Sequence, residues 1–62
     1  MNEIYVKIEW LCYEEEIVTF ETAEQAYEYA QNKSKQDWVN YCKLYICGYL
    51  QYIFDFGKVV QE

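Results

Sequence analysis

The first ten residues constrain the fold most, because apolar and polar side chains alternate there with a period of two. Every second position is apolar: Ile4, Val6, Ile8 and Trp10. Side chains of a strand point alternately to opposite faces, so the pattern predicts a strand over residues 4–10 with one buried face. We expect a turn around residues 13–15 and a second strand over 16–20. A three-residue loop would place Val18 opposite Trp10 and Phe20 opposite Ile8, all on the buried face.

The segment after Phe20 carries the signals of one amphipathic helix. Thr22-Ala23-Glu24-Gln25 has the form of a capping box, in which the Thr hydroxyl accepts a hydrogen bond from the Gln25 backbone N–H. Small and aromatic residues then follow at i, i+3, i+4 and i+7: Ala23, Ala26, Tyr27 and Ala30. We predict a helix over residues 23–33 that packs this stripe against the first strand.

The remaining residues predict a second hairpin. Residues 38–46 are rich in aromatic and aliphatic side chains and favour a third strand. Cys47-Gly48 is a candidate tight turn, since Gly readily supplies a positive φ. Residues 50–56 favour a fourth strand, and Gly57 permits a bulge or a stop. The order is ββαββ, so residues 1–62 are predicted to form one small α+β domain, an antiparallel sheet with the helix on one face.

Large apolar side chains occupy both faces of the predicted third strand. One face would carry Trp38, Cys42, Leu44 and Ile46, and the other Val39, Tyr41, Lys43 and Tyr45. One helix covers only one face, so we expect an open, Tyr-rich surface flanked by Tyr5 and Leu11. Tyr5, Tyr41 and Tyr45 are candidate partner-binding residues, because Tyr is enriched in protein interfaces. The alternative interpretation is the ordinary preference of Tyr for half-buried strand positions.

Charge excludes several classes of partner. The chain has eleven Asp and Glu, five Lys, no Arg and no His, for a net charge of −6. This balance opposes direct nucleic-acid binding and a basic membrane-surface helix. Six acids lie close together in the sequence and are candidates for a negative surface presented to a basic partner: Glu14, Glu15, Glu16, Glu21, Glu24 and Glu28. The alternative is a solvated face that keeps a small protein soluble.

The residues on which most catalytic and metal sites depend are missing. Without His, neither Ser34 nor the thiols of Cys12, Cys42 and Cys47 have a conventional acid–base partner. The spacing of the cysteines does not complete a zinc site, and residues 14–16 lack the pattern of a calcium loop. We therefore predict a non-enzyme with no catalytic residues, no metal ligands and no cofactor. The thiols are predicted to be reduced and to act as small buried hydrophobic groups.

The N-terminal residues carry an acid, Glu3, where a signal peptide has basic residues. No apolar run approaches the roughly 20 residues of a membrane span. The odd number of cysteines is also unlike a secreted mini-protein. We expect a cytoplasmic protein with no membrane partner.

Size, charge and element order together resemble phage-encoded inhibitors of bacterial defence, of which anti-CRISPR proteins and DNA mimics are examples. These are very small, acidic, aromatic-rich proteins, and several are single α+β domains of hairpins and a helix. The resemblance covers the whole chain as architecture, and no motif carries it. It implies a non-catalytic viral inhibitor in the host cytoplasm, which occupies a basic surface of a nucleic-acid-handling defence complex. The alternative is a structural or regulatory homodimer that pairs its open Tyr-rich faces.

Overall fold

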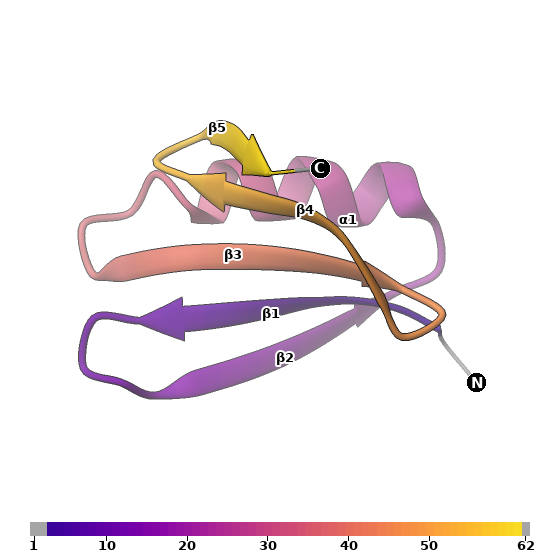
Figure 1. Ribbon diagram of the computed structural model, residues 1–62, viewed down its shortest axis with the longest axis horizontal. Helices are drawn as coiled ribbons and strands as arrows, with labels where there is room; N and C mark the ends of the chain where they lie inside the picture. Colours follow the sequence, from indigo (N-terminus) through magenta and orange to yellow (C-terminus); the bar gives the residue numbers. More distant parts are fainter. Residues whose placement is uncertain (1–2, 62) are drawn as a thin grey trace.

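The computed structural model describes residues 3–61. It contains the strands and the helix in the order β1 (Ile4–Trp10), β2 (Glu15–Phe20), α1 (Ala23–Lys33), β3 (Val39–Ile46), β4 (Tyr49–Asp55) and β5 (Lys58–Gln61). All neighbouring strands are antiparallel, in the spatial order β2-β1-β3-β4-β5, and α1 lies on one face of the sheet (Figure 1). The predicted α+β class and ββαββ order are confirmed, with a fifth strand added at the C-terminal end.

The fifth strand exists because the chain turns tightly a second time. Cys47 and Gly48 have φ values of 53° and 84°, and Phe56 and Gly57 have nearly the same values, 51° and 83°. Two successive positive φ angles are typical of the two-residue turn that matches the twist of a hairpin. The predicted Cys47-Gly48 turn is therefore confirmed. Phe56, which we predicted at the end of a strand, is instead a turn residue that leads into β5.

The predicted register of the first hairpin is wrong. Val18 pairs with Val6 and Phe20 pairs with Ile4. The chain reverses immediately after Trp10, whose backbone N–H donates to the carbonyl of Glu14 at 2.9 Å. Tyr13 adopts a positive φ of 69° and supplies the left-handed residue of this turn. Leu11, which we expected beside Tyr5 at the open surface, consequently lies in the turn. The observed register differs from the predicted one by an even number of residues, so Val18 and Phe20 remain on the predicted face.

The core lies between α1 and the face of the sheet beneath it, which we call the covered face. Eight apolar residues are buried there: Val6, Ile8, Ala26, Ala30, Val39, Cys42, Leu44 and Phe54. Thr22 caps the helix as predicted, its side chain accepting a hydrogen bond from the Gln25 backbone N–H. Ala23, at the first position of the helix, is exposed, and Tyr27 is half-buried. A helix contact that was not predicted joins Tyr29 to Phe20, with ring centroids 5.1 Å apart.

The predicted faces are exchanged at the start of the third strand. Val39 is buried, whereas Trp38 precedes β3 and is 73% exposed. A register shift in the β1–β3 pairing explains the exchange: Glu9 pairs with Tyr41, but Trp10 pairs with Val39. One residue of β3 is thereby left out of the alternation, and Val39 points to the same side as Cys42.

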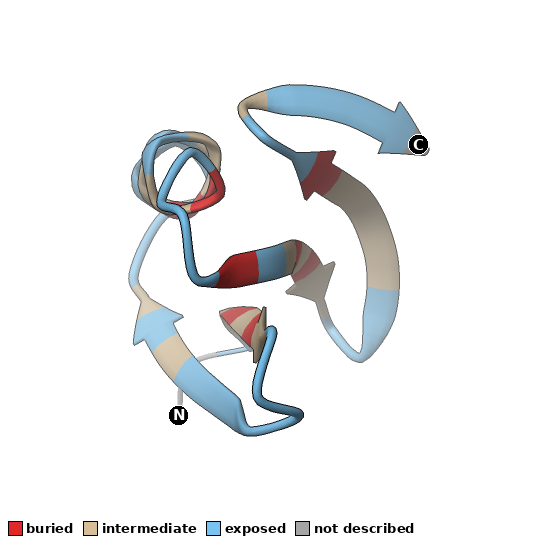
Figure 2. Ribbon diagram, turned by 90° about the vertical axis from the view of Figure 1, so that its left-hand side faces the viewer, coloured by how far each residue is buried: buried red, intermediate tan, exposed pale blue. Residues whose placement is uncertain are grey.

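The β4–β5 hairpin is fixed to the end of the helix through Ser34, the only buried polar residue among those described. Its hydroxyl donates to the carbonyl of Gln31 at 2.9 Å and accepts from the Gly57 backbone N–H at 2.8 Å. The Gln31 side chain also donates to the Gly57 carbonyl, at 3.3 Å. These bonds tie the turn before β5 to α1, and Figure 2 shows β4 and β5 curving toward the side of the sheet that carries the helix.

Candidate functional site

The sheet face away from α1, which we call the open face, carries the predicted tyrosines. Tyr5 of β1 pairs with Tyr45 of β3, and their rings stack with centroids 5.0 Å apart and planes at 12°. Tyr41 lies nearer the start of β3, opposite Glu9. All three are half-buried. The structure thus places Tyr5, Tyr41 and Tyr45 on one face, with two of them in direct contact.

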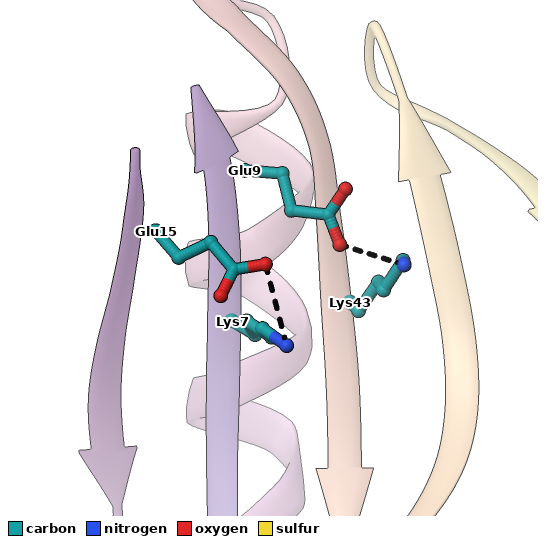
Figure 3. A network of polar contacts seen from close by, with 4 residues as sticks. All are labelled: Lys7, Glu9, Glu15 and Lys43. Atoms are coloured by element: carbon teal, nitrogen blue, oxygen red, sulfur yellow. Dashed lines mark ion pairs between the residues drawn. The ribbon is translucent and has the colours of Figure 1, made fainter. Parts of the chain in front are cut away.

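Ion pairs separate the stacked tyrosines from Tyr41 on this face. Lys43 Nζ lies 2.6 Å from Glu9 Oε2, and Lys7 Nζ lies 3.4 Å from Glu15 Oε2 (Figure 3). The hydrogen bond to Glu9 is the main cause that raises the pKa of Lys43 above its usual value. Charges of the open face are therefore largely compensated within the molecule, and its tyrosines do not form one continuous aromatic surface.

A hollow of about 280 Å³ lies beside these ion pairs, on the side of β4 and β5. Tyr41, Ile53 and Val60 line it together with Glu9 and Lys43. Val60 belongs to the strand that was not predicted, and it is 55% exposed. The open face thus has an apolar part, formed where β3, β4 and β5 lie side by side.

The six candidate acids are divided into two groups by β2. Glu14, Glu15 and Glu16 lie at the β1–β2 turn and the start of β2, whereas Glu21, Glu24 and Glu28 lie at and beyond its other end. A strand of this length separates its ends by roughly 20 Å, about twice the screening length in physiological salt. Figure 1 shows β2 running between the two places. All six are exposed, and Glu15 is paired with Lys7.

Two of these acids border a groove of about 440 Å³ between α1 and the β3–β4 hairpin, which we call the acidic groove. Its helix side is one stripe at i, i+3, i+4 and i+7: Glu24, Tyr27, Glu28 and Gln31. Its sheet side is formed by Leu44, Ile46, Gln51 and Tyr52, and Ala23 lies at one end. The two sides meet where the rings of Tyr27 and Tyr52 contact edge to face, with centroids 5.2 Å apart.

Sequence reasoning missed this groove, although a signal was present. The stripe of Glu24, Tyr27, Glu28 and Gln31 is the helix face adjacent to the buried alanines, and it combines acids with one aromatic residue. Tyr27 was assigned only to the core. The sheet side of the groove, and Tyr52 in particular, depends on how β4 lies against the helix. No local sequence pattern indicates that arrangement.

The three cysteines are free, as predicted, but two of them are exposed rather than buried. Cys12 lies in the β1–β2 turn, and Cys47 in a tight turn donates from its thiol to Glu3 Oε1 at 2.9 Å. That hydrogen bond raises the pKa of Cys47, and burial raises the pKa of Cys42 to about 11. Both thiols are protonated at neutral pH, which makes them poor nucleophiles.

No helix within residues 3–61 is long and apolar enough to cross a membrane. No family model matches the chain, and no curated protein or solved structure matches it significantly.

Proposed function

We propose that this chain is a non-catalytic inhibitor of the anti-CRISPR type, which occupies a basic nucleic-acid-binding surface of a bacterial defence complex in the host cytoplasm. The observation that carries the proposal is the uneven compensation of charge over the surface. Acids of the open face are paired with lysines, whereas Glu21, Glu24 and Glu28 take part in none of the ion pairs formed within residues 3–61. The helix start therefore carries three exposed acids that no ion pair within residues 3–61 compensates.

The lysines are placed elsewhere. Each has its own neighbours: Lys7 beside Glu15, Lys43 beside Glu9, Lys33 over the ring of Trp10, Lys35 against Gly57, and Lys58 opposite Asp55 in the β4–β5 register. A partner that supplies cations to Glu21, Glu24 and Glu28 therefore meets no competing lysine from those positions. Such a field increases the association rate with a basic surface, and salt screens it beyond about 8–10 Å.

The proposed mechanism is competition with nucleic acid. Phosphate-binding grooves hold Lys and Arg for the phosphate backbone, and a carboxylate surface meets the same cations. Direct binding of nucleic acid by this chain is opposed by its net charge of −6. The partner is thus a protein, and nucleic acid is the ligand that the chain displaces.

Capture from a lysate of bacteria that express a defence complex tests the proposal. The immobilised chain is expected to retain a nucleic-acid-binding protein, which added duplex DNA or raised salt releases. A variant with Glu21→Lys, Glu24→Lys and Glu28→Lys should lose the captured protein, while the matched variant Glu14→Lys, Glu16→Lys and Asp37→Lys, with the same change in net charge, should keep it. Capture that DNA does not compete, or equal capture by both variants, would contradict the proposal.

A homodimer through the open face is the second candidate, and the hollow beside Tyr41 favours it. Ile53 and Val60 offer apolar area there, and a domain of this size gains stability from further burial. Light scattering across a concentration series separates the candidates. A dimer that Val60→Lys dissociates, and that Glu24→Lys leaves intact, would support open-face pairing.

A further inference from the structure

We propose that the acidic groove holds one arginine side chain of the protein partner, with the guanidinium at Glu24 and Glu28 and the methylene stem against Tyr27 and Tyr52. This inference rests on the proposed function, because it names the group by which a basic partner is anchored. The groove joins an apolar floor to a charged mouth: Leu44 is 1% exposed, whereas Glu24 and Glu28 are exposed.

The spacing of the two carboxylates fits one planar cation. Glu24 and Glu28 are one helical turn apart, where the Cβ atoms lie about 5–6 Å from each other. Two carboxylates at this spacing repel each other, and a cation placed between them removes the repulsion. A guanidinium carries five donors in a fixed plane and bonds carboxylates in pairs, whereas an ammonium acts as a single point charge.

The aromatic lining favours the same ligand. Tyr27 from the helix and Tyr52 from β4 line the groove beside these acids. Arginine packs its methylene stem on apolar and aromatic surface while its charged guanidinium remains at the mouth. Leu44 and Ile46 complete an apolar wall for the methylene groups. Charge complementarity and shape thus select a long cationic side chain over an acidic or a purely apolar one.

The described lysines leave the groove unfilled by the chain itself. Lys33, the nearest lysine along the helix, lies over the Trp10 ring with its Nζ 5.0 Å from the centroid. Neither Glu24 nor Glu28 belongs to an ion pair formed within residues 3–61. The cation must therefore come from another molecule.

A titration with capped tripeptides, followed by amide chemical shifts of the isotope-labelled protein, tests the inference without any target. The probes are acetyl-Gly-Arg-Gly-amide and its lysine and citrulline counterparts. We expect the arginine peptide to saturate shifts at Glu24, Glu28 and Tyr52 in the millimolar range, with the lysine peptide several-fold weaker and the citrulline peptide without effect. Equal shifts from arginine and citrulline, or shifts confined to the open face, would overturn the inference.

Paired Glu→Gln variants separate the effect of the groove from the effect of net charge. Glu24→Gln with Glu28→Gln should weaken arginine binding about tenfold, since each lost charge-assisted pair removes the stronger class of hydrogen bond. The matched control, Glu14→Gln with Glu16→Gln, makes the same change in charge away from the groove and should bind as the unmodified chain does. Equal weakening in both variants would show general screening and overturn the site.

The two proposals fail in different ways. If the groove does not bind the arginine peptide but the lysine-substituted helix still loses its captured protein, the acidic surface acts without an arginine anchor. If the groove binds the peptide and no DNA-competed protein is captured, the anchor serves a partner of another kind.

Discussion

The two faces of the sheet are built from the same strands but stabilised by different interactions. On the covered face, Val6, Ile8 and Phe54 are fully buried beneath the helix. On the open face, neighbouring positions of the same strands carry half-buried tyrosines and two ion pairs. The covered face is therefore set by burial, and the open face by pairwise contacts between adjacent strands.

This difference separates stability from recognition. Burial of a large apolar side chain contributes several times more free energy than a cross-strand ion pair near the surface. Substitutions on the covered face should thus decide whether the chain folds, whereas substitutions on the open face should leave the fold in place. The acidic groove lies at the border, since its floor belongs to the core and its mouth to the surface.

The largest expected difference lies between two adjacent residues of β4. Phe54→Ala removes a fully buried ring from the covered face and should cost about 3–5 kcal/mol, which approaches the whole free energy of unfolding of a domain this small. Ile53→Ala, on the open face, is half-buried and should cost about 1 kcal/mol. Urea unfolding of both variants measures the ratio. Equal losses would show that the open face is buried in solution, as in a dimer.

Ser34 should have the next largest effect, because it is the buried polar group that joins the end of the helix to the β4–β5 hairpin. Ser34→Ala leaves the Gly57 N–H without its acceptor and should cost about 1–3 kcal/mol. Hydrogen exchange offers an internal control: the Gly57 amide should exchange faster, whereas the amide of Gly48, in the equivalent turn of the other hairpin, should be unaffected. Equal acceleration at both glycines would indicate global rather than local opening.

How far the sequence predicts these features depends on how local their causes are. The helix was predicted with its observed bounds, because its capping residue and its stripe of alanines lie within a few residues of one another. The register of the first hairpin was wrong, because it depends on the left-handed conformation of Tyr13, a residue that rarely adopts one. The exchange of Trp38 and Val39 comes from an irregularity in strand pairing, which side-chain alternation cannot report.

The candidate site was predictable only in part for the same reason. Alternation along β1 and β3 placed Tyr5, Tyr41 and Tyr45 on one face, and the structure confirms that placement. The six acids are adjacent in the sequence, but an extended strand divides them into two groups. The acidic groove joins residues on α1 to residues on β4 that are far apart in the sequence, so its aromatic lining emerges only from the tertiary structure.

The buried thiol provides a smaller, pH-dependent test of the covered face. Burial raises the pKa of Cys42 to about 11, above the value of roughly 8.5–9 expected in the unfolded chain. As the pH rises, the Cys42 thiol therefore loses its proton in the unfolded state before it does so in the folded state. Deprotonation thus favours the unfolded state, and the free energy of unfolding is unaffected below pH 8 and declines as the pH rises toward 11. By pH 10 the loss should be about 1–2 kcal/mol.

The variant Cys42→Ala isolates this contribution from the titration of other groups. Unfolding curves between pH 7 and 10 should show a steeper loss of stability for the unmodified chain than for the variant. A thiol reagent at pH 8 should label the exposed Cys12 in the native state and reach Cys42 only on unfolding. Parallel pH profiles, or rapid labelling of Cys42 in the native state, would contradict the burial of this thiol.

The ion pairs of the open face should give the smallest effects, and their ranking tests whether that face is solvated. Lys43 and Glu9 are separated by 2.6 Å with both side chains about three-quarters covered, whereas Lys7 and Glu15 are separated by 3.4 Å and Glu15 is more exposed. Double-mutant cycles with Lys→Met and Glu→Gln should give a coupling of about 0.5–1 kcal/mol for the first pair and less than about 0.5 kcal/mol for the second. Both couplings should shrink in 1 M salt, where the screening length falls to about 3 Å. Because folding raises the pKa of Lys43, the stability that this lysine contributes also depends on pH. The contribution is complete below the pKa of the unfolded state and is lost as the pH rises through the pKa of the folded state. Couplings that are larger than these and insensitive to salt would mean that water does not reach the pairs, which requires a second molecule to cover the open face.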